Sequence, residues 1–312
     1  MQGRDKYRIP FIRQCLKNMH ERAREEDYFA PRVFAEAVRW LEQNRDADKF
    51  FLTVESFDPH EPWFVPEHYR RLYDDSDGPE QVLSGYADTS SLSPELLRRT
   101  RANYSGLVTM CDRWFGYFYE AMANMGLLDN TLLIVTSDHG HSIGDGDYLG
   151  KRGYPSHPSV YDVPLFVRLP DGRGAAQRCD AIVQHHDLAA EILRFAGIEP
   201  PEPLDGVPFV EEALAGAAVR DHATVGWGGA VTVIDGKWFF NCKVDGTGPF
   251  LHDLGARDPF AENVADREPD VVRRMFEVAV EDAGGEFPEY LLNIARRQKD
   301  APGCSALAAR PV

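Results

Sequence analysis

The sequence predicts an α/β protein in which a mostly parallel sheet is flanked by helices and followed by a small antiparallel sheet with a helix. Residues 49–57 and 131–136 are short segments in which apolar residues occupy both faces with few interruptions. Strands of that kind are typical of parallel sheets covered by helices. After about residue 220, short apolar segments alternate with turn residues, which indicates antiparallel strands. Together these patterns favour one large α/β domain with a smaller α+β appendage.

The first part of the chain is expected to be mainly helical around the strand at 49–57. Residues 1–28 show little periodicity and are predicted to form a loop with a short helix. Pro31 can open a helix, because its fixed φ suits the first turn and apolar residues follow it at helical spacing. The polar, turn-rich residues 67–93 indicate a loop. A long helix is then predicted from its cap at Ser93 to its terminator at Gly126.

The rest of the main domain alternates between strands and helices. Residues 163–168 restart a strand, and residues 180–184 are predicted to add a short third one. Asp187 is the expected N-cap of a helix that ends near Gly197. A short helix near 208–214 closes the domain.

The C-terminal region favours a small antiparallel sheet. Asp235-Gly236 is a strong hairpin turn, and residues 269–283 have the apolar spacing of a helix. We therefore expect an α/β portion at 1–218, a small α+β subdomain at 219–292 and a mobile tail at 293–312. The predicted strands of the subdomain are 223–225, 230–234, 237–242 and 250–254.

Composition excludes several classes of partner. The chain has 312 residues, 43% of them hydrophobic, and a formal net charge of −16, which disfavours a nucleic-acid backbone as partner. No apolar run approaches the length of a membrane span, and the polar start is unlike a secretory signal. The five cysteines show no close pairing, which favours a reducing, cytoplasmic compartment. The sequence does not predict the oligomeric state.

Polar residues with metal-binding chemistry follow the apolar strand at 131–136. Asp138 and His139 come directly after it, where ligand sites lie in open α/β sheets. A carboxylate oxygen and an imidazole nitrogen side by side suit a divalent metal, whereas the structural alternative is that Asp138 caps the next turn. His60 likewise follows the strand at 49–57, where it could instead shape a proline-rich turn. Lys151 follows a glycine-rich loop and could instead be a surface lysine.

The order and spacing of these pieces resemble the sulfatase family, within the alkaline phosphatase superfamily. The resemblance covers residues from about Tyr28 to about Leu292 and matches the later part of the family's pattern. The matching segments are Phe50-Phe51-Leu52, Asp58-Pro59-His60-Glu61-Pro62-Trp63, Asp129-Asn130-Thr131, Ser137-Asp138-His139-Gly140, Gly144-Asp145, Lys151, Val163-Pro164-Leu165 and His186-Asp187-Leu188-Ala189.

The resemblance implies an alkaline-phosphatase-like fold and metal-dependent hydrolysis of a small-molecule or glycan sulfate ester. By this matching, Asp138 and His139 would bind the metal, and Lys151 would contact the sulfate and its bridging oxygen. His60 would hydrogen-bond the sulfate or protonate the leaving group. Many family members have asparagine at the position of His139, and histidine is familiar there in phosphonate and phosphodiester hydrolases. The metal is therefore expected to be Ca²⁺ or Mn²⁺/Mg²⁺, and phosphonate or phosphodiester hydrolysis is the alternative activity.

One part of the family's pattern is absent from the sequence. The family's nucleophile is a formylglycine made within a Cys/Ser-x-Pro-Ser-Arg motif, and none of the five cysteines lies in such a motif. We therefore expect no nucleophile in these residues and expect the formylglycine in a preceding segment. The chain is accordingly predicted to be a fragment, inactive and poorly stable by itself. A non-catalytic domain that binds an anion or a partner is the third hypothesis.

Overall fold

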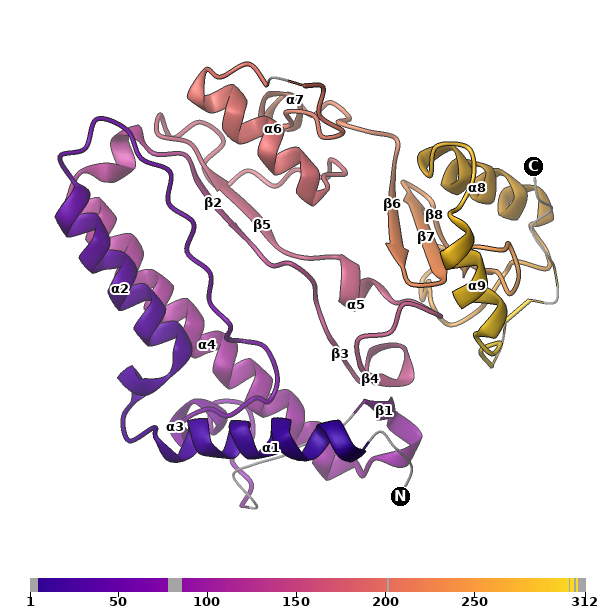
Figure 1. Ribbon diagram of the computed structural model, residues 1–312, viewed down its shortest axis with the longest axis horizontal. Helices are drawn as coiled ribbons and strands as arrows, with labels where there is room; N and C mark the ends of the chain where they lie inside the picture. The colour runs from indigo at the N-terminus through magenta and orange to yellow at the C-terminus, as the bar shows by residue number, and fades with distance from the viewer. Residues whose placement is uncertain (1–4, 78–85, 201, 303, 306, 308–312) are drawn as a thin grey trace. The chain divides into compact units, whose positions relative to one another are not determined.

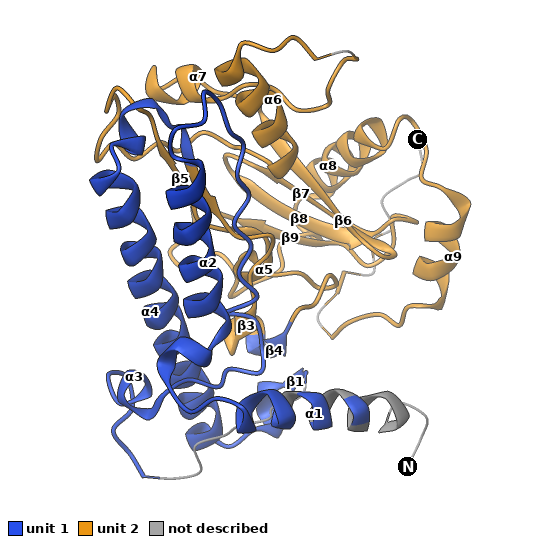
Figure 2. Cartoon of the chain, turned by 60° about the vertical axis from the view of Figure 1, so that its left-hand side comes forward, with its two compact units in different colours: residues 1–133, 147–150 blue, residues 134–146, 151–312 orange. Residues whose placement is uncertain are grey.

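The computed structural model describes residues 5–77, 86–200, 202–302, 304, 305 and 307 (Figure 1). The chain divides into two compact units, residues 1–133 with 147–150 and residues 134–146 with 151–312 (Figure 2). Each unit has its own hydrophobic core. Within the described ranges, no helix combines the length and apolar character that a membrane crossing requires.

The first unit is mainly helical. Its elements are α1 (Asp5–His20), the 3-10 turn η1 (Glu25–Asp27), α2 (Phe29–Asn44), α3 (Glu67–Arg70), β1 (Ala87–Asp88), η2 (Thr89–Ser91), α4 (Pro94–Asn124), η3 (Leu127–Asn130) and β4 (Tyr148–Gly150). The sequence predicted less helix before residue 28 than the 16 residues of α1.

Helices α2 and α4 lie side by side and form the core of the first unit (Figures 1 and 2). Leu41 from α2 is fully buried against Phe118 and Met122 from α4. The predicted cap of α4 is confirmed, because the Ser93 hydroxyl accepts a hydrogen bond from the backbone N–H of Leu96 at 3.2 Å.

The strand predicted at 49–57, with apolar residues buried on both faces, is wrong for the described structure. Phe50, Leu52 and Val54 pack against the α2–α4 core, whereas Phe51 and Phe57 on the other face are 74% and 53% exposed. That alternation indicates an extended chain. Among the described residues, no backbone–backbone hydrogen bond reaches the segment between Phe50 and Ser56, so it lacks the ladder that defines a strand.

The second unit contains the sheets. Its elements are β2 (Leu133–Thr136, beginning at the boundary between the units), β3 (Ser142–Ile143), η4 (Asp145–Asp147, ending at the boundary), α5 (Pro158–Tyr161), β5 (Leu165–Arg168), α6 (His185–Ala196), α7 (Val210–Leu214), β6 (His222–Trp227), β7 (Ala230–Asp235), β8 (Trp238–Lys243), β9 (Phe250–Asp253), α8 (Pro269–Asp282) and α9 (Glu289–Arg297).

Strands β2 and β5 pair in a two-stranded sheet and lie side by side in Figure 1. The strands predicted at 131–136 and 163–168 are thereby confirmed. The third, at 180–184, is irregular, and the chain there leads directly into α6. Helix α6 begins after Gln184 rather than at Asp187, because the Asp187 carboxylate accepts the N–H of Gln184 from within the first turn at 2.7 Å.

The small antiparallel sheet has the order β6-β7-β8-β9 and confirms the predicted strands. Asp235 forms its hairpin turn and accepts the N–H groups of Lys237 and Trp238. Val233 pairs with Phe240, and the sheet buries these side chains in the core that α8 covers with Met275 and Phe276. Each such burial contributes roughly 1.5–3 kcal/mol. Residues 293–297, which we assigned to the tail, belong to α9.

Candidate active site

Asp138 and His139 lie together directly after β2, as predicted. The backbone N–H of His139 donates to Asp138 Oδ1 at 2.9 Å, and His139 Nε2 lies 3.4 Å from Asp138 Oδ2. His139 Nδ1 is 3.0 Å from the carbonyl oxygen of Gly140. Because a carbonyl oxygen only accepts, Nδ1 donates its proton in this contact, and Nε2 is the ring nitrogen that faces the carboxylate. An imidazole nitrogen and a carboxylate oxygen therefore adjoin each other.

This pair fits a divalent metal as two of its ligands. Metal-bound histidines usually donate their other ring N–H to a carbonyl or carboxylate oxygen, as His139 does to Gly140. The Asp138 side chain is 84% exposed, so an ion can reach it from solvent. Among the described residues, no group of three or more His, Cys, Asp or Glu side chains could hold a metal. Further ligands would therefore be needed to complete the four or more that structural and catalytic metals take.

Three contacts from other elements hold the loop that carries Asp138 and His139. His185, at the start of α6, donates from Nε2 to the carbonyl oxygen of Ser137 at 2.7 Å. The Gly140 N–H donates to the Val160 carbonyl oxygen at 2.9 Å. A Cβ atom at Gly140 would lie 2.0 Å from the Ser159 carbonyl oxygen, so only glycine fits this approach.

Lys151 follows β4 and is half-buried. The glycine-rich loop before it is shaped by Asp145, whose carboxylate accepts the N–H of Ile143 at 3.0 Å. The neighbouring Arg152 is engaged with the backbone, because its guanidinium donates to the carbonyl oxygen of Pro155 at 3.0 Å. Asp145 therefore shapes the glycine-rich loop.

His60 lies in a loop that buried contacts hold rigid. Asp58 Oδ2 accepts the N–H of Ala30, in the first turn of α2, at 3.0 Å. This bond lowers the pKa of Asp58, but burial of the carboxyl has the larger effect and raises it. The buried Trp63 indole donates to the Pro59 carbonyl oxygen at 2.9 Å. The imidazole of His60 stacks on Phe57 with ring centroids 4.5 Å apart. These contacts restrict both the loop and the imidazole.

The predicted site residues are divided between the two units. His60 belongs to the first unit, and Asp138, His139 and Lys151 belong to the second. Asp138 and His139 are the two that the structure brings into contact with each other.

A serine tetrapeptide in the second unit partly matches the nucleophile motif. Ser156-His157-Pro158-Ser159 has the first four positions, and Val160 replaces the arginine of the fifth. The Ser156 side chain is buried, and its hydroxyl lies 3.0 Å from the Thr232 hydroxyl. These contacts assign Ser156 to the packing of α5 against β7 rather than to catalysis.

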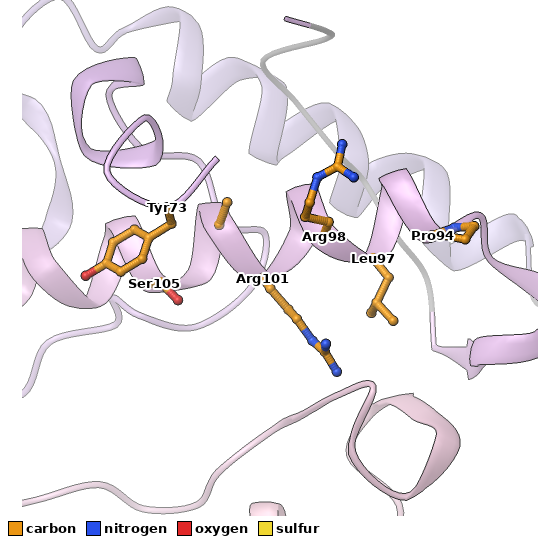
Figure 3. Close-up of a pocket in the computed structure, with 7 residues that line it drawn as sticks. Tyr73, Pro94, Leu97, Arg98, Arg101 and Ser105 are labelled. Carbon is orange, nitrogen blue, oxygen red and sulfur yellow. The ribbon is translucent and has the colours of Figure 1, made fainter. Parts of the chain in front are cut away.

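A cavity of about 450 Å³ lies in the first unit beside α4 (Figure 3). Leu97 and Arg101 extend from one side of the helix and Arg98 from the other, and the ring of Tyr73 lies beside Ser105. Arg98 Nε lies 3.5 Å from Asp74 Oδ2, so part of its charge is compensated. None of the four predicted site residues lines this cavity.

Comparison with known proteins agrees with the fold described above. The sequence profile of the sulfatase family matches residues 4–198, more than half of the chain. An arylsulfatase of Clostridium perfringens is 28% identical over 192 residues, which cover 56% of this chain and 40% of that protein. The multifunctional alkaline phosphatase superfamily protein PehA of Trinickia caryophylli is 27% identical over 220 residues, covering 58% of this chain and 42% of that protein.

Among solved structures, a phosphonate monoester hydrolase of Agrobacterium radiobacter matches with a TM-score of 0.66 and 25% identity, over 88% of this chain and 61% of that one. The alkaline-phosphatase-like fold predicted from the sequence is thereby confirmed. The chain belongs to the sulfatase family. It spans 40% and 42% of the length of the two curated relatives named above.

Proposed function

We propose that this chain contributes metal-binding, substrate-binding and proton-transfer groups to the hydrolysis of a small-molecule or glycan sulfate ester. The observation that carries this proposal is the Asp138–His139 pair, in which an imidazole nitrogen adjoins a carboxylate oxygen in a member of the sulfatase family. The similarity to an arylsulfatase supports the sulfate ester as substrate.

Each residue has a defined part in this proposal. Asp138 and His139 would hold a divalent cation, Ca²⁺ or Mn²⁺/Mg²⁺, which when bound would neutralise charge on the sulfate oxygens. The ammonium of Lys151 would bind the anionic ester and lower the charge that repels a nucleophile. His60 would hydrogen-bond the sulfate or give a proton to the leaving oxygen.

The nucleophile is not among these groups. None of the five cysteines lies in the Cys/Ser-x-Pro-Ser-Arg motif, and the serine that comes nearest to it, Ser156, is buried. We therefore expect the 312 residues alone to bind a metal weakly and to show no turnover.

A metal titration with parallel rate measurements tests this proposal. The chain would be titrated with Mn²⁺ and Ca²⁺ by calorimetry and assayed on aryl sulfate and aryl phosphonate esters. Asp138→Asn with His139→Ala should abolish binding of the metal, and Asp145→Asn should leave it unchanged because that carboxylate is bonded to the loop backbone. Equal binding by both variants would contradict the assignment, and metal-dependent turnover by the chain alone would contradict the expected inactivity.

A second activity is favoured by His139 and by the similarity to a phosphonate monoester hydrolase. Phosphonate and phosphodiester substrates carry the same kind of anionic oxygens, so the same residues would bind them. The ratio of aryl phosphonate to aryl sulfate hydrolysis, measured on the chain completed with the nucleophile segment of a relative, separates the two. Binding of sulfate without hydrolysis of either ester would identify a non-catalytic anion-binding domain.

A further inference from the structure

The imidazole of His60 is held through one ring nitrogen. His60 Nδ1 lies 2.7 Å from the Glu61 carbonyl oxygen and 3.2 Å from Oε2 of the Glu61 carboxylate. Both oxygens act as acceptors for a ring N–H, so Nδ1 carries the proton. Proton exchange with a substrate would then go through Nε2.

The Glu61 carboxylate is itself fixed by a second residue. The Tyr86 hydroxyl donates to Glu61 Oε1 at 2.7 Å, so one carboxylate oxygen bonds the phenol and the other faces the imidazole. Burial, followed by the bond to Glu61, raises the pKa of Tyr86, so its hydroxyl remains a donor over the physiological range.

Tyr86 is placed by pairing between two strands that are distant in sequence. It immediately precedes β1, in which Ala87 pairs with Leu149 of β4. Its ring packs over Gly150, where a Cβ atom would lie 2.7 Å from Tyr86 Cγ. The absence of a side chain at Gly150 therefore lets the phenol approach the strand that directly precedes Lys151. The pairing of β1 with β4 therefore places Tyr86, which bonds the residue after His60, beside the strand that ends at Gly150.

We propose that Glu61 and Tyr86 are positioning residues for His60, fixing the Nδ1–H tautomer and the orientation of the ring toward the leaving group. This inference rests on the proposed function for the catalytic role of His60, but the hydrogen-bonded chain from Tyr86 through Glu61 to His60 stands on its own contacts. Outer contacts of this kind fix the tautomer in other histidine-containing sites.

Side-chain ¹⁵N NMR of the full chain tests the contact without reference to activity. In the unaltered chain we expect His60 to show the Nδ1–H pattern. Glu61→Gln places an amide where a carboxylate stood, so we expect a larger fraction of the Nε2–H tautomer. Tyr86→Phe releases one end of Glu61 and should broaden the His60 signals. An unchanged His60 pattern in both variants would overturn the proposal.

Matched controls separate a local effect from a general one. Tyr117→Phe removes a phenol hydroxyl at nearly the same exposure as Tyr86, 46% against 47%, and Glu120→Gln alters an exposed glutamate on α4. Neither control should change the His60 signals. Circular dichroism of all four variants should match that of the unaltered chain, and Glu61→Asp, which keeps the carboxylate, should retain more of the Nδ1–H pattern than Glu61→Gln.

Kinetics of the chain completed with a nucleophile segment connect the contact to the reaction. Glu61→Gln should lower kcat roughly tenfold with little change in KM, because general acid–base catalysis acts in the transition state. A change in the NMR pattern without any ester hydrolysis by the parent would mean that the positioning contact is correct and the proposed function is wrong. A change in KM with kcat unchanged would overturn the positioning role.

Discussion

His185 Nε2 lies 2.7 Å from the carbonyl oxygen of Ser137. This bond ties the first turn of α6 to the residue immediately before Asp138, although 48 positions separate the two in sequence. The loop with the Asp138–His139 pair is therefore held from outside, in addition to the bond that the Ser137 hydroxyl donates to the His139 carbonyl oxygen at 2.9 Å.

Removing the His185 imidazole should loosen this loop. His185→Ala loses one hydrogen bond, so we expect the free energy of unfolding to fall by about 1 kcal/mol. Hydrogen exchange at the amides of Asp138, His139 and Gly140 should accelerate. His222→Ala is the control, because His222 of β6 makes a comparable contact, 3.0 Å to Asp282 of α8, away from this loop. Faster exchange at 138–140 in both variants would show that His185 has no special role there.

Gly140 should not tolerate even one additional methyl group. A Cβ atom would lie 2.0 Å from the Ser159 carbonyl oxygen, and that oxygen belongs to backbone, which cannot swing aside. We expect Gly140→Ala to lower the free energy of unfolding by roughly 1–3 kcal/mol, as overpacking does. Urea unfolding followed by circular dichroism measures this loss.

The control for Gly140 is Gly226 in β6. A Cβ atom there has nothing within 4 Å, and its φ is not positive, so Gly226→Ala should leave stability unchanged or slightly increase it. Equal losses for the two variants would mean that the close approach to Ser159 is not the cause.

The sequence pattern predicted the structure correctly where residues close together in the sequence determine it. The cap at Ser93 and the turn at Asp235 bond to groups two or three positions away, so the sequence contains both partners. The pairing of Asp138 with His139 was predictable for the same reason. These features formed as expected.

The sequence-based prediction failed where a residue bonds to a group that is distant in the sequence, or where a segment needs a neighbouring strand that the local pattern does not specify. Asp187 was expected to cap α6, but it is fully buried and also accepts the N–H of Val207 at 3.0 Å and pairs with Arg220. The segment 49–57 has the apolar residues of a buried strand, but strand formation depends on a neighbouring strand that its own residues do not specify. His185 and Tyr86 likewise form hydrogen bonds to residues distant in the sequence, and no local motif predicts these bonds.

Acid should destabilise the second unit through His157 and His252. Burial lowers the pKa of both imidazoles below their ordinary value of 6.5, and their rings lie 5.0 Å and 4.9 Å from that of Phe260. The unfolded chain therefore binds more protons than the folded chain below about pH 6.5. The stability that these groups contribute is present above that pH and is lost as the pH falls through the lowered pKa values.

Urea midpoints measured from about pH 7.5 down to about pH 5.5 should fall with pH. His252→Gln should make the decline shallower, because it removes one group that must become charged on unfolding. His68→Gln, which alters an imidazole with a 63% exposed side chain in the first unit, should leave the decline unchanged. A midpoint independent of pH in the unaltered chain would exclude this linkage.

Phe51 should promote self-association of the chain. Its side chain is 74% exposed on a segment whose backbone makes no ladder among the described residues, and an exposed apolar strand edge favours pairing with another chain. We expect Phe51→Lys to reduce the average mass measured by sedimentation at high concentration. Because the side chain faces solvent, the free energy of unfolding should change by no more than about 0.5 kcal/mol.

Two further substitutions separate the apolar ring from the added charge. Thr53→Lys places the same charge on the same exposed face but leaves Phe51 in position, so association should persist. Leu52→Lys points into the α2–α4 core and should unfold the first unit instead. If Thr53→Lys suppressed association as fully as Phe51→Lys, charge repulsion would explain the effect. If only Phe51→Lys suppresses association, the exposed phenylalanine ring is the part of the segment that mediates it.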